Sequence, residues 1–326
     1  MTDTFAFLVI TMIIILGFEA VNGWTDAPNA VATVISTRVL NPMAAVMMAA
    51  VFNVVGALSG TAVATTIGKG IVDLDAVTLE TTAAAALAVI IWSTFAWYFG
   101  LPTSESHGIV AGIAGAGVAV AGFDVLLWDG WRKVFTGVGL AVVGGAVGGL
   151  VLMTFLSWLM RNASPTLARR LFGPLQIGSA AFMAWSHGTA DGQKAMGVMA
   201  MALAIYYERD FAVPIWVILL AASVMGVSTA MGGWRIIRTL GMRLTSLQPV
   251  HGFAAETAAA VTLTITARMG IPLSTTHTIG SAIMGVGATR RLSAVRWGLA
   301  YEIVMAWILT FPVCFGLGWL FAFLIP

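Results

Sequence analysis

The chain has 326 residues, of which 59% are hydrophobic and 9% are charged. Soluble domains carry roughly one-quarter charged residues, so this composition excludes an ordinary water-soluble protein. The formal net charge of +2 is too small and too dispersed for a nucleic-acid-binding surface. The single cysteine, Cys314, excludes an internal disulfide and a cysteine metal cluster.

Long apolar stretches predict helices that cross a lipid bilayer. In chain order they are 5–21, 43–67, 82–99, 134–160, 211–231, 253–267 and 304–325. Most are near the ~20 residues that span the hydrocarbon core. Because lipid offers no hydrogen bonds to a bare backbone, these segments must be helical and their breaks must face protein or water. We expect no cleavable signal, since the first stretch begins almost at Met1. The predicted fold class is an all-α polytopic membrane protein.

Two polar segments each occur twice, in the same order. Residues 22–30 contain Asn-Gly-Trp-Thr-Asp-Ala-Pro-Asn-Ala, and 187–195 contain His-Gly-Thr-Ala-Asp-Gly-Gln-Lys-Ala. Residues 100–107 contain Gly-Leu-Pro-Thr-Ser-Glu-Ser-His, and 270–277 contain Gly-Ile-Pro-Leu-Ser-Thr-Thr-His. The spacing from aspartate to proline is 76 positions in the first half and 81 in the second. The chain is therefore a duplicated unit, and a membrane protein of this kind places its substrate site between the repeats near the bilayer midplane.

Loop charges predict that the two repeats have opposite orientations. Loop 69–80 carries one Lys and three acids, whereas its counterpart 235–248 carries three Arg and no acid. Loop 124–133 is balanced, whereas 290–296 again carries three Arg and no acid. Short loops rich in Lys and Arg stay in the cytoplasm. Each half then has an odd number of crossings, about five, with broken or re-entrant half-helices at the midplane.

This orientation predicts the organisation of the whole chain. The first repeat is 1–160, a cytoplasmic connector is 161–174 with three arginines over 161–170, and the second repeat is 175–326. Both termini are expected outside, in a multi-pass protein of the cell (inner or plasma) membrane. The sequence leaves the oligomeric state open, a homodimer included.

The proline-containing segments predict an oxyanion pocket. Proline suits the first position of a helix, so Pro102 and Pro272 are expected to begin half-helices inside the membrane. The N–H groups and the positive dipole end of each helix favour an anion, and inverted repeats aim two such ends at one point. The hydroxyl-bearing candidates for phosphate binding are Thr103, Ser104, Ser106, Ser274, Thr275 and Thr276. The alternative is that these hydroxyls only join transmembrane helices.

The first aspartate segment predicts a cation site. Asn22, Asp26 and Asn29 offer side-chain oxygens, and Gly23 and Pro28 are expected to break the helix and release backbone carbonyls. Oxygen ligands suit a small hard cation such as Na⁺. A carboxylate at membrane depth costs roughly 2.5–3.5 kcal/mol and is a functional candidate by default.

The second aspartate segment supplies His187, Asp191, Gln193 and Lys194 instead. It therefore carries a cation of its own, and the alternative for Asp191 is a structural ion pair with Lys194 three residues on. A proton on Asp26 or Asp191 could replace the metal ion, and the sequence does not distinguish the two. Both Na⁺ and H⁺ remain candidate coupling ions.

The aspartate segments, the block 270–277 and the block Gln-Pro-Val-His-Gly-Phe-Ala-Ala-Glu-Thr at 248–257 resemble the inorganic phosphate transporter family, the PiT permeases, over essentially the whole chain. This resemblance implies an inverted-repeat secondary transporter that moves phosphate with sodium or protons, although some bacterial members carry sulfate. By position, it implies phosphate contacts from Ser104, Ser106, Ser274, Thr275 and Thr276, and coupling-ion sites at or beside Asp26, Asn29 and Asp191. Thr25 and Ala190 stand where the family usually has Asn, which removes an amide oxygen from each presumed ion site.

Glu105 stands where the second repeat has Thr275, so a carboxyl group lies beside the expected anion pocket. We expect Glu105 to contribute to ion coupling. The secondary candidates, each with a structural alternative, are His107, His277, His187, Lys194 and Glu256.

These observations predict a phosphate symporter coupled to Na⁺ or H⁺ that works by alternating access, with no covalent step and no cofactor beyond the bound ion. One alternative keeps the fold and carries sulfate. Another is a membrane enzyme acting on a phosphorylated lipid, with Ser and His as nucleophile and base. A third is an anion channel, whose flux would ignore ion gradients.

Overall fold

The computed structural model describes residues 4–325, which form helices joined by short loops. The first repeat contains α1 (Phe5–Ser36), α2 (Pro42–Ala57), α3 (Ala62–Lys69), the 3₁₀ turn η1 (Leu74–Ala76), α4 (Leu79–Tyr98), α5 (Glu105–Ala121), the 3₁₀ turn η2 (Phe123–Val125) and α6 (Trp128–Leu159). The second contains α7 (Pro165–Tyr207), α8 (Ile215–Thr229), α9 (Trp234–Arg238), the π-helical turn η3 (Thr239–Arg243), α10 (Pro249–Arg268), α11 (Thr275–Ala288), the 3₁₀ turn η4 (Leu292–Ala294) and α12 (Trp297–Leu324). Apart from η1, every element of the first repeat has a counterpart in the second.

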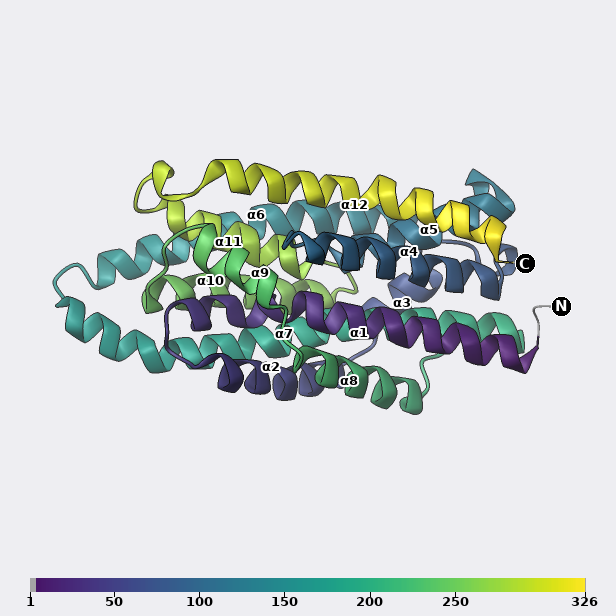
Figure 1. Cartoon of the computed structure of the whole chain (residues 1–326), viewed down its shortest axis with the longest axis horizontal. Coiled ribbons are helices and arrows are strands. Elements are labelled where there is room, and N and C mark those ends of the chain that lie inside the picture. Colours follow the sequence, from purple (N-terminus) through teal and green to yellow (C-terminus); the bar gives the residue numbers. More distant parts are fainter. Residues whose placement is uncertain (1–3, 326) are drawn as a thin grey trace.

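The two repeats run in opposite directions, as the loop charges predict. Figure 1 shows α1 leading away from the end of the molecule that carries both termini, whereas its counterpart α7 leads back toward that end. The last helices of the repeats, α6 and α12, are opposed in the same way. The turn after α4 and the turn after α10 also match, because Gly100 and Gly270 have φ angles of +71° and +65° that an L side chain rarely adopts.

Helix length and composition confirm an all-helical membrane fold. Within residues 4–325, four helices, α1, α4, α6 and α12, are long and apolar enough to cross a bilayer. Two further apolar segments are bent: α2 meets α3 at 73°, and α8 meets the α9–η3 helix at 60°. These bends show that the fold has broken helices. The first break lies within the apolar stretch 43–67 and the second at the end of the stretch 211–231, where the sequence predicted none.

The helices that bear the aspartates are continuous, so the predicted breaks at these segments are wrong. Helix α1 runs through Gly23 and Pro28, and α7 runs through Gly188. These glycines serve close packing, since a Cβ at Gly23 would lie 1.8 Å from the Ser228 hydroxyl and a Cβ at Gly188 would lie 2.1 Å from the Asn53 carbonyl oxygen. Most backbone carbonyls that the expected cation site would have used are therefore engaged within helices, although Pro28 has no N–H to bond the Trp24 carbonyl one turn back. Helix α7 also begins at Pro165, inside the expected connector.

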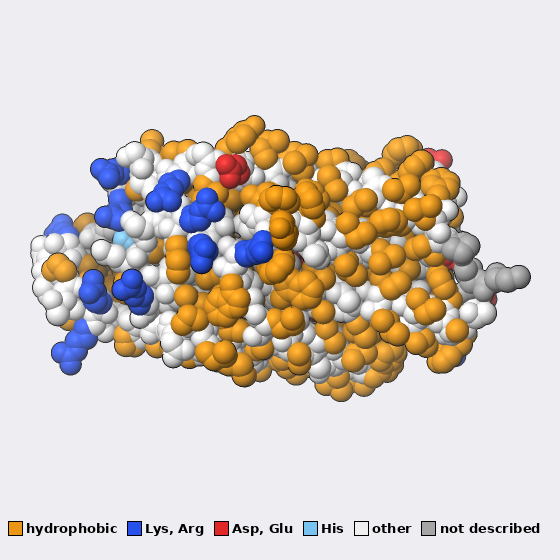
Figure 2. All heavy atoms as spheres, viewed as in Figure 1, with side chains coloured by type: hydrophobic (Ala, Val, Ile, Leu, Met, Phe, Trp, Pro, Cys, Tyr) orange, Lys and Arg blue, Asp and Glu red, His pale blue; other side chains and the backbone are white. Residues whose placement is uncertain are grey.

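The surface has a basic end and an apolar body. Figure 2 shows Lys and Arg side chains gathered over the end opposite the chain termini, with hydrophobic side chains over much of the remaining face. Large apolar side chains such as Phe155, Val227 and Leu324 are 53–72% exposed, which suits contact with lipid.

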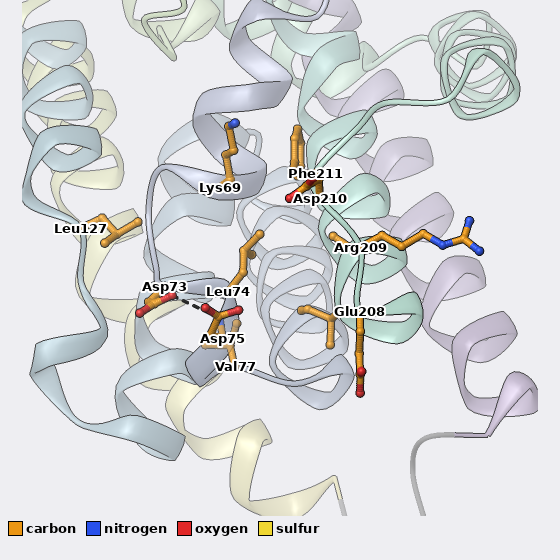
Figure 3. A pocket seen from close by; sticks show the side chains of 12 residues that line it. Lys69, Asp73, Leu74, Asp75, Val77, Leu127, Glu208, Arg209, Asp210 and Phe211 are labelled. Carbon is orange, nitrogen blue, oxygen red and sulfur yellow. Dashed lines mark hydrogen bonds between the residues drawn. The ribbon is translucent and has the colours of Figure 1, made fainter.

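The end that carries the termini has a pocket of about 770 Å³ (Figure 3). Its lining combines the acids Asp73, Asp75, Glu208 and Asp210 with two basic residues, Lys69 and Arg209. The segments around it come from both repeats, the α3–α4 connection from one and the α7–α8 connection from the other. The charges of the two ends therefore differ in sign.

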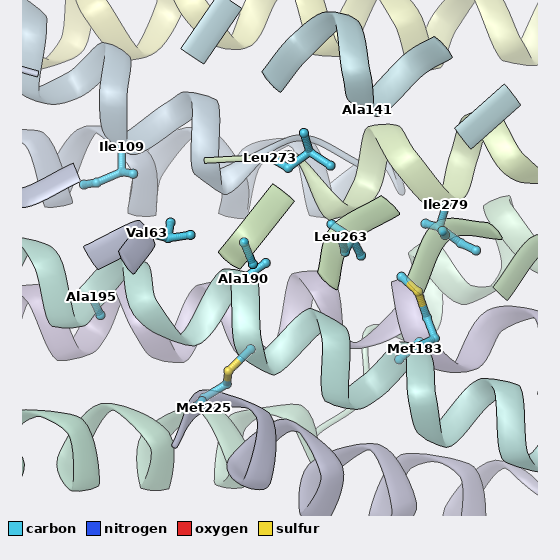
Figure 4. Packing of buried hydrophobic residues seen from close by; sticks show 14 of the residues in the cluster. Val63, Ile109, Ala141, Met183, Ala190, Ala195, Met225, Leu263, Leu273 and Ile279 are labelled. Atoms are coloured by element: carbon cyan, nitrogen blue, oxygen red, sulfur yellow. The ribbon is translucent and has the colours of Figure 1, made fainter. Parts of the chain in front are cut away.

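The core lies between the repeats and encloses both half-helices. Helix α6 packs against α11 of the other repeat, and α12 packs against α5. Figure 4 shows side chains of both repeats, among them Ile109, Met183, Leu263 and Leu273, meeting in this core. Helix α5 is too short to span the bilayer. Its residues 105–117 are all buried, so protein shields most of this helix from lipid.

Candidate functional site

Helices α5 and α11 begin with the same cap. The hydroxyl oxygens of Ser104 and Ser274 accept hydrogen bonds from the backbone N–H groups of His107 and His277, each at 3.2 Å. A serine before the first helical residue satisfies one of the free donors at a helix start. The prediction that Pro102 and Pro272 begin these helices is therefore wrong by a few residues, because both prolines lie in the extended approach to the cap.

The starts of the two half-helices meet at the centre of the molecule. The Ser106 hydroxyl donates to the carbonyl oxygen of Leu273 at 2.9 Å. The rings of His107 and His277 contact each other edge to face, with centroids 4.7 Å apart. Helix α12 supports this junction, since the Trp307 ring stacks on His277. The predicted convergence of the two helix ends is thus present.

Asp26 on α1 is bound to the start of α11. The Thr276 hydroxyl donates to Asp26 Oδ1 at 2.9 Å, and the Asn29 amide donates to the same oxygen at 2.8 Å. The Asn29 amide also donates to the Thr276 hydroxyl oxygen at 2.9 Å. These three side chains form a closed hydrogen-bonded triangle that joins the first repeat to the second.

Asp191 on α7 is the most heavily bonded carboxylate of the site. Its Oδ1 accepts from the Thr275 hydroxyl at 2.8 Å. Its Oδ2 lies 3.0 Å from Lys194 Nζ and 3.2 Å from His187 Nε2. His187 Nδ1 in turn lies 2.9 Å from Asn53 Oδ1 on α2. The ion pair with Lys194, the structural alternative for Asp191, is therefore formed.

Glu105 joins the same cluster from the first turn of α5. The Thr25 hydroxyl donates to Glu105 Oε1 at 2.9 Å, and the Thr103 hydroxyl approaches that oxygen at 3.5 Å. On the other side of the cluster, Lys194 Nζ donates to Asn22 Oδ1 at 3.4 Å, and the Asn22 amide donates to Glu19 Oε2 at 3.3 Å. Thr25, at a position where the resemblance noted in the sequence implies Asn, thus binds a carboxylate.

Acidic groups outnumber basic groups at this centre. The buried carboxyl groups are Glu19, Asp26, Glu105 and Asp191, and within the described residues Lys194 is the one buried Lys or Arg. Each of these five side chains is at most 3% exposed. The site is closed from both ends of the molecule in this conformation. Carboxyl groups this deeply buried must either carry a proton or have positive charge close by.

Oxygen atoms without hydrogen-bond partners lie at this centre. In residues 4–325, Asn29 Oδ1, Glu105 Oε2 and Glu19 Oε1 are buried without a donor. Asn29 and Glu105 flank Asp26, and unpaired oxygens of this kind suit a hard cation such as Na⁺. Asp26, His187 and Asp191 also bring ligand atoms within 4.8 Å of one another. The Asp26 side fits Na⁺ better, because Lys194 already occupies Asp191 and a hard cation prefers oxygen to a histidine nitrogen.

Glu256 on α10 lies outside this cluster and has its own partners. The hydroxyls of Thr33 and Ser179 donate to its two carboxylate oxygens, and the Gln176 amide donates to Oε1 at 3.3 Å. Gln176 also accepts from the Thr37 hydroxyl at 2.8 Å. The group ties α1, α7 and α10 together.

Several of these partners were absent from the sequence predictions. Thr33 follows Asn29 by one helical turn, so the polar stripe of α1 was long enough to suggest it. Asn53 is a lone amide in an apolar stretch, a signal of the same kind. Gln176 and Ser179 lie on one face of α7 three positions apart.

Comparisons with known proteins agree with this architecture. The sequence model described as the phosphate transporter family matches residues 22–318. A probable low-affinity inorganic phosphate transporter of Rhizobium meliloti (strain 1021) is 43% identical over 314 residues, which cover 95% of this chain and 94% of the relative. A protein with the same description from Bacillus subtilis (strain 168) is 39% identical over 320 residues, with 95% and 96% covered.

The fold also matches a solved structure described as the sodium-dependent phosphate transporter, with a TM-score of 0.90. The match covers 100% of this chain and 99% of the other at 22% sequence identity, which establishes the common fold. The family model spans both halves, including both aspartate segments and both half-helix starts. The chain therefore belongs to the phosphate transporter family.

Proposed function

We propose that this chain is a secondary symporter that carries inorganic phosphate and a cation together through the centre of the molecule. The observation that supports this proposal is the meeting of two half-helix starts, capped by Ser104 and Ser274, beside the carboxylates of Asp26 and Asp191. Membership of a transporter family agrees with the expectation that the chain is not an enzyme and leaves the lipid-modifying alternative without support.

Phosphate would bind between the starts of α5 and α11. The first N–H groups of a helix have no carbonyl one turn back, so both helix starts present donors and a positive dipole end. The hydroxyls of Ser106, Thr275 and Thr276 already donate to oxygen acceptors in this closed state. A phosphate oxygen can replace such an acceptor. Lys194, the one buried Lys or Arg among the described residues, supplies positive charge at this centre.

The cation would bind on the Asp26 side, with Asn29 and Glu105. Phosphate adds negative charge to a centre that already holds four carboxyl groups and one lysine. A bound cation lowers this electrostatic cost, and the bound anion in turn stabilises the cation. Such reciprocal coupling typically amounts to ~1–3 kcal/mol. The sodium-dependent description of the structural neighbour favours Na⁺ as the first ion to test.

Transport requires that the closed centre open to one side at a time. The bends between α2 and α3 and between α8 and α9 lie at equivalent places in the two repeats. Broken helices at the repeat interface allow one bundle to move against the other around a fixed site. Because α6 packs against α11 and α12 packs against α5, each moving bundle would combine helices of both repeats, and the expected boundaries 1–160 and 175–326 do not separate the bundles.

Uptake by proteoliposomes tests the proposal directly. Purified protein is reconstituted, and uptake of radiolabelled phosphate is measured with an inward Na⁺ gradient, with an inward H⁺ gradient and with neither. Symport predicts accumulation above equilibrium with one of the gradients alone. Uptake that ignores both gradients indicates a channel. Strong inhibition by excess sulfate indicates the sulfate alternative.

The positive-inside rule supports a cytoplasmic basic end and external termini in the cell membrane. Substituted-cysteine labelling tests this orientation. Ser164→Cys, in the α6–α7 connection, should be labelled from the cytoplasm, and Asp75→Cys from outside. The lone native cysteine, Cys314, is buried and gives little background. The oligomeric state, which the sequence leaves open with a homodimer included, can be determined by mass measurement in detergent.

A further inference from the structure

The duplicated fold builds the same pair of joined loops at opposite ends of the molecule. In the first repeat, Asp73 N–H donates to the Val125 carbonyl at 2.9 Å. In the second, Arg296 N–H donates to the Leu244 carbonyl at 3.0 Å. The second pair encloses a cleft of about 610 Å³, which is separate from the central site. It is lined by Met242, Thr245, Ser246, Arg290, Arg291, Ser293, Ala294 and Arg296.

The lining of this cleft is basic and hydroxylic. Its lining residues include three arginines and three residues with hydroxyl groups, and no acidic residue is among them. In the described part of the chain, none of the ion pairs includes Arg290, Arg291 or Arg296. The corresponding loops of the first repeat carry Asp73, Asp75 and Asp124 instead. The two pairs of loops therefore have the same backbone arrangement but opposite charge, so the positive charge comes from the side chains of the second repeat alone.

The walls of the cleft are held in place by hydrogen bonds. The Thr245 hydroxyl donates to the Ala294 carbonyl at 3.0 Å, and the Trp297 indole N–H donates to the Leu292 carbonyl at 2.8 Å. Arg290 Nη1 approaches the Ser246 hydroxyl oxygen at 3.4 Å. A fixed frame reduces the entropy lost when arginines close on a ligand.

We propose that this cleft, the arginine cleft, is a second binding site for a phosphate group. Guanidinium groups match phosphate oxygens in a two-pronged geometry, and the neighbouring hydroxyls can donate to the remaining oxygens. Two sources supply this chemistry: the headgroup of an anionic phospholipid, or free inorganic phosphate. The placement of the cleft at the cytoplasmic surface, where released phosphate would reach it, rests on the proposed function.

The rim of the cleft suits a lipid headgroup. Leu292 and Trp297 are 70% and 52% exposed beside the arginines, and Met242 is 55% exposed. Apolar side chains next to a basic pocket at the membrane boundary can contact the lipid chain while the arginines hold the phosphate. The cleft volume also lies in the range of pockets that hold molecules larger than a phosphate ion.

Two binding assays on the full chain separate the sources. The test protein is the triple variant Arg290→Gln, Arg291→Gln, Arg296→Gln. The matched control removes three exposed arginines from the α6–α7 region: Arg161→Gln, Arg169→Gln, Arg170→Gln. In the lipid arm, dioctanoyl phosphatidylglycerol is titrated into detergent-purified protein, with dioctanoyl phosphatidylcholine as the uncharged comparison, and the thermal midpoint is followed. A lipid site predicts at least about tenfold weaker phosphatidylglycerol binding in the test variant only.

In the phosphate arm, equilibrium dialysis with radiolabelled phosphate is done on Asp26→Asn protein, in which the central site is impaired. A free-phosphate site predicts residual binding that the triple substitution weakens at least about tenfold and the control leaves unchanged. Loss in either arm confined to the test variant supports the proposal and names the source. No loss in either arm, or equal loss in the control, overturns it. Normal phosphate uptake by Asp26→Asn would instead contradict the proposed function and leave the lipid arm intact.

Discussion

The hydroxyl of Thr276 donates to the carboxylate of Asp26 at 2.9 Å although the two residues are 250 positions apart in the chain. This bond joins a transmembrane helix of the first repeat to the half-helix start of the second. A ligand that draws Thr276 toward itself must weaken this bond, and a cation on Asp26 makes that exchange less costly. In the proposed mechanism, this pair of side chains therefore links the anion site to the cation site.

Removing that hydroxyl should weaken phosphate binding. Thr276→Val keeps the shape of the side chain but removes the donor to Asp26 and to phosphate. We expect the KM for phosphate to rise about tenfold, the usual effect of losing a hydrogen bond to a charged group. Thr278→Val is the matched control, because the Thr278 hydroxyl donates back to the Ser274 carbonyl within the same helix. Concentration series of uptake in liposomes measure both, and an equal effect on the two variants would argue for a general loss of helix stability.

The two aspartates should each be essential for uptake. Asp26→Asn and Asp191→Asn keep the side-chain volume but remove the charge that the coupling cation and Lys194 require. We expect at least about tenfold slower phosphate accumulation, in line with a coupling energy of ~1–3 kcal/mol. Asp129→Asn, on the exposed start of α6, serves as the control. Wild-type rates in both test variants would refute the assignment.

Glu105 should affect the coupling ion more than phosphate. Glu105 bonds to Thr25 and has a free carboxylate oxygen, so Glu105→Gln removes a cation ligand or a proton carrier while retaining most of the packing. The expected result is a changed dependence of uptake on Na⁺ or external pH, with at most about a twofold change in the apparent phosphate affinity. Ion titrations at fixed phosphate check this. Equal losses in ion and phosphate dependence would count against the role.

Glu256 should matter for stability more than for ion dependence. Glu256→Ala leaves the buried donors of Thr33 and Gln176 without an acceptor, and each such group costs about 1–3 kcal/mol, whereas the Ser179 hydroxyl keeps the Gln176 carbonyl as an acceptor at 3.1 Å. We expect a lower thermal midpoint in detergent, with Glu256→Gln less affected because an amide oxygen still accepts. A variant with normal stability and altered ion dependence would instead place Glu256 in the coupling machinery.

Close packing of α12 on α5 gives a test that is independent of function. A Cβ at Gly318 would lie 2.4 Å from the Gly112 carbonyl oxygen, whereas a Cβ at Gly316 would meet nothing within 4 Å. Gly318→Ala should destabilise the protein by about 1–3 kcal/mol, the usual cost of overpacking. Gly316→Ala, two positions away in the same helix, should be neutral. Thermal unfolding in detergent compares the two, and equal midpoints would mean that α12 can shift freely along α5.

Much of the fold could be predicted because the duplication repeats its signals. The aspartate segments, the proline-containing segments and the charges of the loops each occur in matched pairs. The positions of the helix breaks could not be predicted in the same way. Gly23 and Pro28 look like helix breakers in sequence, but neighbouring helices close around them and keep α1 continuous. Whether a glycine breaks a helix or admits a neighbour depends on contacts that only the packed structure contains.

At the candidate site, too, some residues could be predicted from the sequence and others could not. The sequence identified Asp26, Asp191 and Glu105, because a carboxyl group inside a membrane is unusual in any context. Their partners, such as Asn53 for His187, are ordinary polar residues on other helices, and only the fold determines which of them meet.

The last helix of each repeat packs against the half-helix of the other repeat: α6 lies along α11, and α12 lies along α5. During synthesis the first half therefore enters the bilayer with the flank of α5 unfilled. That gap persists until residues 297–324, which follow all the other described helices in the chain, arrive to close it. A chain shortened by one helix would lose the wall of a half-helix at the opposite end of its sequence, so severed halves should regain transport only when both are made in the same cell.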